Sequence, residues 1–217
     1  MLKYLFNKAP EEEFSILCLG AHSDDIEIGC GGTILRLIKE HKRLLITWII
    51  FSSDEQRASE AHASADAFLK DAYEKKVFIK DFQNGYFPYL GKQIKDYFEQ
   101  LKPDLSPDLI FTHYRNDLHQ DHRLINELTW NTFRNHQILE YEIPKYDGDL
   151  GTPNFYVDLD EKISKQKVDY LIDNFKTQAD RFWFTRETFN SILRLRGVEA
   201  NAPSRYAEAF YGRKISI

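Results

Sequence analysis

The chain is poor in cysteine, with only Cys18 and Cys30 among its 217 residues. The two form no Cys-x-x-Cys pattern, so neither a disulfide framework nor a thiolate zinc site is indicated. Cys18 lies in an apolar run and is expected to be a small buried hydrophobic side chain. Cys30 is expected to serve packing as well.

Long apolar runs and strong positive charge are also missing. No run approaches about 18 apolar residues, so the sequence predicts no membrane span. The first seven residues lack the apolar core of a signal peptide, and we expect a soluble, cytoplasmic protein. The formal net charge is -5, without a basic stripe, which argues against nucleic acid as a partner. Small polar substrates are permitted.

Short apolar runs alternate with amphipathic segments over the first two-thirds of the chain. Strands are predicted at residues 15–20, 44–51, 77–79 and 108–112. Helical spacing of apolar residues lies between and after them, around 34–38, 58–68, 94–101 and 124–133. Such near-continuous apolar strands suit a parallel sheet that is covered on both faces. The pattern predicts an α/β fold: a Rossmann-like, doubly wound, mainly parallel sheet with helices on both faces.

The order of elements is less regular beyond about residue 136. Strands are predicted at 138–143 and 155–159, and helices near 161–175 and 185–196. We interpret this part as an addition to the same unit, so residues 1–217 are predicted to form a single domain.

Two short stretches, far apart in the sequence, hold three of the seven histidines and four carboxylates. They are Ala21-His22-Ser23-Asp24-Asp25 and Asp117-Leu118-His119-Gln120-Asp121-His122. Imidazole and carboxylate groups are what a divalent transition metal and a general acid–base pair require. Taken alone, each stretch has a structural explanation, because its aspartates can cap the helix that follows.

Topology favours the functional interpretation of these stretches. One follows the first predicted strand and the other follows the fourth, while residues 52–57 follow the second. Ligands of open parallel sheets bind beyond the carboxyl ends of the strands, so we expect the three loops to share one rim. Gly29, Gly31 and Gly32 are expected to let the chain turn tightly into a helix, but they come too late for a dinucleotide-binding motif.

The first stretch resembles the Ala-His-Pro-Asp-Asp signature of the PIG-L/LmbE-like zinc-dependent N-deacetylases, and the second resembles that family's other signature. The similarity extends to Arg57 and Glu60 and to Tyr206-Ala207-Glu208-Ala209-Phe210. It therefore spans most of the chain in the family's order.

Three positions depart from the family pattern. Ser23, Leu118 and Gln120 stand where proline is common. We interpret them as marks of a subfamily and not as a loss of activity.

The resemblance implies a zinc site made by His22, Asp25 and His122. Two imidazoles and one carboxylate leave a position open for water, as catalytic zinc sites do. Asp24 is implied as the general base.

Four further residues are expected to have roles in the site, that of Arg57 from the chemistry of its guanidinium group. His119 would stabilise the oxyanion or protonate the leaving amine, and Asp121 would orient the His119 ring. Asp117, on the lip of the site, and Arg57 would bind substrate, although a surface ion pair with Glu60 is an equal explanation for Arg57.

Other residues near the two stretches stay open. His113 could support the site from outside or be a structural histidine, and Glu208 could buttress the site. The aromatic clusters at 86–89 and 182–184 are more typical of a core or a subunit contact than of a site.

The sequence therefore predicts a zinc-dependent hydrolase that removes the N-acetyl group from an amino sugar or its conjugate, releasing acetate and a free amine. One alternative is the same site acting on an amide of a thiol conjugate or of a non-sugar compound. Another is a sugar-binding module without turnover. The expected partner is the small amino-sugar substrate, and a homo-oligomer is left open.

Overall fold

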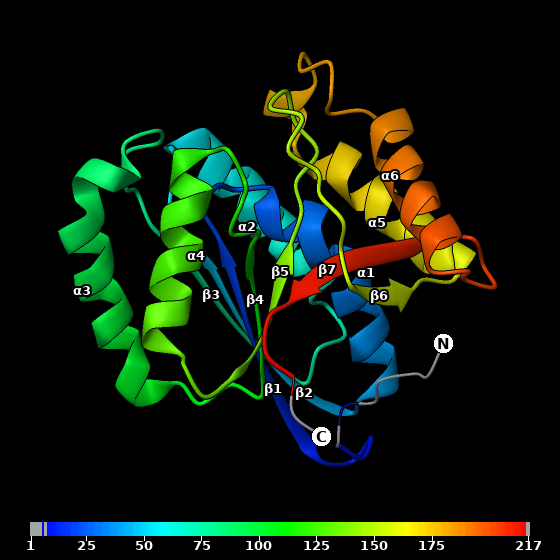
Figure 1. Cartoon of the computed structure of the whole chain (residues 1–217), viewed down its shortest axis with the longest axis horizontal. Coiled ribbons are helices and arrows are strands. Elements are labelled where there is room, and N and C mark those ends of the chain that lie inside the picture. The colour runs from blue at the N-terminus through cyan, green and yellow to red at the C-terminus, as the bar shows by residue number, and fades with distance from the viewer. Residues whose placement is uncertain (1–5, 7, 216–217) are drawn as a thin grey trace.

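A seven-stranded sheet forms the centre of the computed structural model, which describes residues 6 and 8–215 (Figure 1). The strand order is β3-β2-β1-β4-β5-β7-β6. The strands are β1 (Glu13–Gly20), β2 (Arg43–Ile50), β3 (Glu74–Ile79), β4 (Leu109–His113), β5 (Gln137–Tyr141), β6 (Phe155–Asp158) and β7 (Ala207–Gly212). The first five pair in parallel, whereas β7 runs antiparallel to both β5 and β6.

Helices cover both faces of the sheet, as Figure 1 shows. On one face lie α1 (Asp25–Glu40), α2 (Glu55–Phe68), α5 (Glu161–Asn174) and α6 (Arg186–Glu199), and on the other α3 (Gly91–Leu101) and α4 (Gln120–Thr132). Successive side chains of a strand point to opposite faces, so Trp48 enters one apolar core and Ile49 the other. The α/β fold predicted from the sequence, doubly wound with helices on both faces, is confirmed.

The tight turn expected from the glycines of the first motif is wrong. Gly29, Gly31 and Gly32 all lie inside α1. A methyl group on Gly29 would come within 2.2 Å of a ring carbon of Tyr141, and one on Gly31 within 2.6 Å of the Phe68 ring. These glycines therefore permit close packing against neighbouring elements, and no turn occurs there.

The strand β7 has no counterpart among the predicted elements. It enters the sheet between β5 and β6, and the buried Glu208 fastens it. That carboxylate accepts hydrogen bonds from the backbone of Gly32 at 2.8 Å and Thr33 at 2.6 Å, and from Lys167 at 2.5 Å. Glu208 thus joins β7 to α1 and α5.

The adjacency of β1 and β4 positions the functional residues. Chain order reverses between these two strands, and the crevice at such a switch point is where open sheets bind ligands. Both strands continue directly into a motif loop and then into α1 or α4. Among the described residues, no helix is long and apolar enough to cross a membrane.

Candidate metal centre

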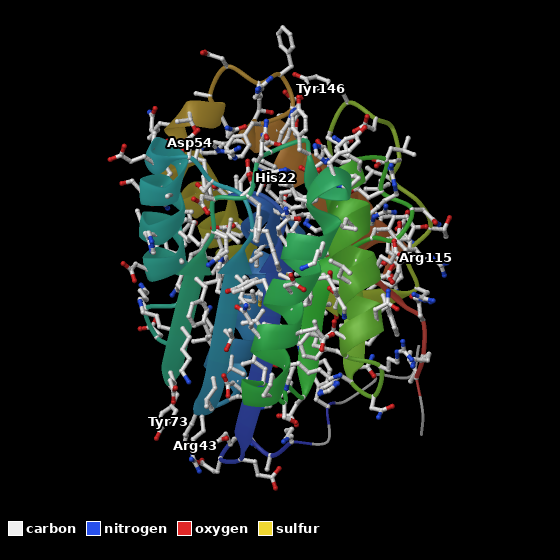
Figure 2. The ribbon with its side chains drawn as sticks, turned by 90° about the vertical axis from the view of Figure 1, so that its left-hand side faces the viewer. His22, Arg43, Asp54, Tyr73, Arg115 and Tyr146 are labelled. Atoms are coloured by element: carbon white, nitrogen blue, oxygen red, sulfur yellow. The ribbon has the colours of Figure 1, made fainter. Side chains whose placement is uncertain are left out.

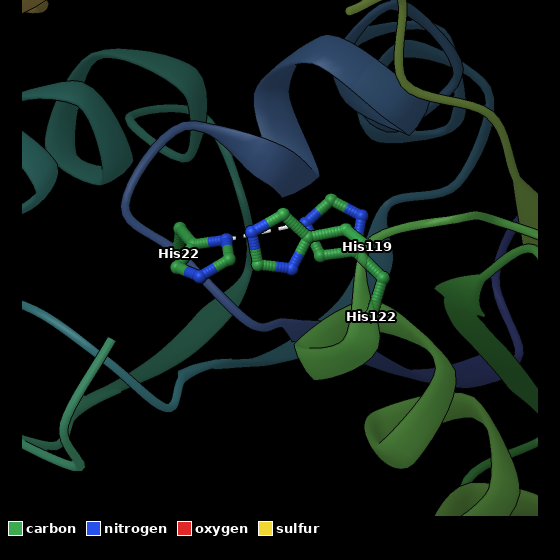
Figure 3. Close-up of side chains that lie close together, drawn as sticks. All are labelled: His22, His119 and His122. Atoms are coloured by element: carbon green, nitrogen blue, oxygen red, sulfur yellow. Dashed lines mark hydrogen bonds between the residues drawn. The ribbon is translucent and has the colours of Figure 1, made fainter. Parts of the chain in front are cut away.

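The two motif loops meet at the carboxyl ends of β1 and β4, where three histidine rings lie together (Figure 3). In the first loop, the backbone N–H of His22 donates to Asp25 Oδ2 at 2.6 Å and closes the turn into α1. In the second, His119 caps α4, and its Nδ1 accepts from the backbone N–H of Asp121 at 3.3 Å. In its neutral form the His119 ring therefore carries its proton on Nε2.

Three of the predicted residues bring donor atoms close to one another. His22 Nδ1 lies 3.1 Å from His122 Nε2 and 3.3 Å from Asp25 Oδ2, and His122 Nε2 lies 3.6 Å from Asp25 Oδ1. With metal–nitrogen distances of about 2.0–2.1 Å, two donors of a tetrahedral zinc site stand about 3.3 Å apart. All three residues are buried. The donor set and its spacing fit a metal ion.

The two imidazoles differ in protonation, and the carboxylates beside His22 favour a positive charge at this point. Burial opposes a charge on His22, but the carboxylates of Asp25 and Asp121 outweigh it and raise its pKa to about 10. Burial and the neighbouring His113 lower the pKa of His122 to about 3. With His22 charged and His122 neutral, His22 Nδ1 donates to His122 Nε2, and a metal ion bound between them would displace that proton.

Asp24 lies beside the donor cluster with one oxygen unused. Its Oδ1 accepts from Arg57 Nη2 at 3.0 Å, whereas its buried Oδ2 has no hydrogen-bond partner in the described part of the chain. Burial raises the pKa of the Asp24 carboxyl, although the Arg57 guanidinium acts in the opposite direction. The alternative explanation for Arg57, an ion pair with Glu60, is wrong. Glu60 accepts instead from the backbone N–H and the hydroxyl of Thr177, at 2.9 and 2.6 Å.

Asp117 differs from its predicted place on the lip of the site. It is 2% exposed, and its Oδ2 contacts His122 Nδ1 at 2.9 Å and Lys145 Nζ at 3.0 Å. The loop from β5 to β6 brings in Lys145 and closes this side of the cluster. Asp117 therefore holds His122 and Lys145 from inside the protein and does not lie on an exposed lip.

The structure also corrects the expected partner of Asp121. Its Oδ2 lies 3.3 Å from His22 Nε2, and its two oxygens accept from the backbone of Gly85 at 2.6 Å and Phe87 at 3.1 Å. The carboxylate orients the ring of His22 and not that of His119, which meets Asp121 only through the backbone amide.

His113 is the last residue of β4 and is fully buried. Its Nε2 accepts from the backbone N–H of Ala21 at 2.9 Å, and its ring stacks on that of His122 with centroids 3.9 Å apart. His113, Asp25 and His122 form a second group whose donor atoms lie within 4.8 Å of one another, as do those of His22, His119 and His122. Because Ala21 already occupies Nε2, His113 fits the role of a supporting residue better than that of a ligand.

Sequence reasoning missed the residues that reach the site from other loops. Lys145 comes from the loop after β5, and Gly85 and Phe87 come from the segment between β3 and α3. Phe87 is buried, with its ring centroid 6.1 Å from that of His22, whereas its neighbours Tyr86 and Tyr89 are exposed. Only the aromatic cluster at 86–89 signalled this segment, and its residues have two different roles.

The fold and the donor cluster define an α/β protein with a candidate metal centre at the switch point of its sheet. The chain belongs to the PIG-L family: the family model described as GlcNAc-PI de-N-acetylase matches residues 17–133. That range contains both motif loops.

Solved structures share the fold over most of the chain. An N,N'-diacetylchitobiose deacetylase from Pyrococcus horikoshii is 21% identical with a TM-score of 0.69, covering 92% of this chain and 83% of that one. GalB, the 4-carboxy-2-hydroxymuconate hydratase from Pseudomonas putida KT2440, is 16% identical with a TM-score of 0.71, covering 94% and 98%. The zinc inhibited form of teicoplanin deacetylase Orf2 is 12% identical with a TM-score of 0.66, covering 91% and 97%. At these identities the likeness establishes the fold.

Proposed function

We propose that the protein is a zinc-dependent N-deacetylase that hydrolyses the acetamide group of an N-acetylated amino sugar or its conjugate. One observation carries this proposal: three zinc-type donors converge beside a buried carboxylate that has an unused oxygen. The family description and the two deacetylases of the same fold support it. The donor set of two imidazoles and one carboxylate supports zinc as the ion.

His22, Asp25 and His122 would hold the ion, with His22 and His122 bonded from behind by Asp121 and Asp117. A zinc ion there supplies a Lewis acid for the amide carbonyl and lowers the pKa of a bound water toward neutrality. The outer carboxylates fix which nitrogen of each ring faces the ion.

Asp24 and His119 divide the proton transfers. Asp24 Oδ2 is the base that takes the proton of the attacking water, and the Arg57 guanidinium holds the carboxylate in place through Oδ1. His119 donates from Nε2 to the developing oxyanion or to the departing nitrogen, since its Nδ1 is occupied as an acceptor. Burial lowers the pKa of His119, which makes its ring a readier proton donor once charged.

Two exposed tyrosines near the site are proposed contacts for a sugar substrate. Tyr86 and Tyr146, both exposed, adjoin residues bonded into the site, and Figure 2 shows Tyr146 at the same end of the molecule as His22. Aromatic rings offer apolar faces with polar edges to a bound ligand.

Arg57 stays proposed as a substrate contact, and the single domain over residues 1–217 and the cytoplasmic location stay predictions.

The direct test is a screen of N-acetylated sugars, nucleotide sugars and glycolipid headgroups with the metal-stripped protein and with added zinc. We expect release of acetate and a free amine that requires the metal. A protein that binds no zinc, or that gains no amide hydrolysis from it, would overturn the proposal. Amide cleavage confined to thiol conjugates or non-sugar compounds would favour the alternative substrate. Hydration of an unsaturated acid, the reaction in the name of GalB, would assign different chemistry to the same fold.

A further inference from the structure

Asp121 joins a metal-site histidine to a segment of backbone that belongs to neither motif. Its side chain is wholly buried. One oxygen contacts His22 Nε2 and the amide of Gly85, and the other accepts from the amide of Phe87. A single carboxylate therefore touches the metal site on one side and residues 85–87 on the other.

The segment from Gly85 to Leu90 offers backbone N–H donors to that carboxylate. Gly85 has φ +81°, a conformation that suits glycine, and it turns its own N–H and that of Phe87 toward the same side chain. Gln120 Nε2 donates to the Gly85 carbonyl at 3.1 Å. The short helix η1 (Phe87–Leu90) follows and carries Tyr89, which is 82% exposed.

Occupation of His22 Nδ1 by a metal constrains the far side of the same ring. The ring can then neither flip nor turn its Nε2 away from Asp121, and Nε2 is left as the nitrogen that donates. The fixed ring in turn holds the Asp121 carboxylate in the orientation in which it accepts from the amides of Gly85 and Phe87. Phe87 adds a second contact, because its ring stacks on that of His22.

We propose that Asp121 is a positioning residue that couples metal binding at His22 to the ordering of residues Gly85–Leu90. The inference rests on the metal centre of the proposed function. Coupling between two sites is reciprocal, so the ordered segment strengthens metal binding by the same factor by which the metal favours the ordered segment.

Hydrogen exchange of the full-length protein, first stripped of metal and then saturated with zinc, tests the coupling. In the wild type, we expect zinc to slow exchange in peptides covering residues 83–90 by about tenfold or more. In Asp121→Asn, zinc should bind about 10- to 100-fold more weakly, measured by competition with a chromogenic chelator. At saturating zinc this variant should show no zinc-dependent slowing at 83–90.

Asp117→Asn is the matched control. It removes the carboxylate behind His122 but none of the contacts of Gly85–Leu90. It should therefore also weaken zinc binding, yet keep the slowing at 83–90 once zinc is saturating. This difference separates the path through Asp121 from a general effect of metal on the fold.

The inference is overturned if zinc protects peptides covering residues 21–25 in the wild type and leaves 83–90 unchanged. It is also overturned if Asp121→Asn keeps the zinc-dependent slowing. If Asp121→Asn fails to fold, the wild-type comparison still tests whether zinc orders residues 83–90, and no slowing there overturns the inference. A wild type that binds no zinc would overturn the proposed metal centre and this coupling together, whereas zinc binding without slowing overturns the coupling alone.

Discussion

Asp24 is the residue whose chemistry most directly separates a hydrolase from a binding module. Substituting Asp24→Asn keeps the shape of the side chain but removes the proton acceptor, so we expect kcat to fall about 10²- to 10⁴-fold. Zinc binding should persist, because the three proposed ligands are untouched. Steady-state kinetics on a substrate found by the screen, together with a zinc titration, measure both effects.

The control for Asp24 is Glu55→Gln, an exposed carboxylate in the first turn of α2 that should leave kcat unchanged. Wild-type turnover by Asp24→Asn would assign the base to another residue. If the wild type and Asp24→Asn bind the ligand equally and neither hydrolyses it, the sugar-binding module is favoured.

The sequence predicted which residues gather at the site better than it predicted their partners. His22, Asp25 and His122 come together because their loops follow neighbouring parallel strands, and this depends on topology alone. The partner of Asp121 depends on a side-chain rotamer and on a segment arriving from between β3 and α3. No spacing in the sequence reports either, so a bond to the nearby His119 was predicted in error.

At the scale of elements, the helix α5 is anchored by one buried ion pair. Lys167 Nζ lies 2.5 Å from Glu208 Oε1 and donates to the carbonyl of Ile28 at 2.6 Å, with both charged side chains at most 3% exposed. We expect Lys167→Met to lower the free energy of unfolding by about 3–5 kcal/mol, because it leaves the Glu208 charge buried without its ammonium partner. Denaturant unfolding followed by circular dichroism measures the loss.

Lys165→Met on the same helix is the matched control. Lys165 is paired with Asp169 but is 76% exposed, so its removal should cost about 0–1 kcal/mol. Equal losses in the two variants would contradict a special role for the buried pair.

Elements with strong periodicity were predictable, and those that depend on distant contacts were not. The strands β1, β2 and β4 are largely buried and nearly continuous in apolar residues, because helices cover both faces. By contrast, β7 contains Glu208, whose charge is compensated by Lys167 from α5 and by backbone donors from α1. A buried carboxylate inside a strand becomes explicable only after those partners are known.

For the whole molecule, the metal ion is expected to act as a cross-link between loops that follow different strands. Its proposed ligands come from the loop after β1 and from the first turns of α1 and α4, so zinc binds the folded chain and finds no such set in the unfolded one. Zinc at about 100 times its dissociation constant should stabilise the fold by about 2.7 kcal/mol. For a chain of this size that corresponds to a rise in Tm of about 5–11 °C, which a thermal melt of metal-stripped protein with and without zinc measures. His122→Ala should abolish this rise while Glu55→Gln keeps it. An equal rise in Tm for the wild type, His122→Ala and Glu55→Gln would show that zinc stabilises the molecule from another site. The cluster between β1 and β4 would then not be the zinc site.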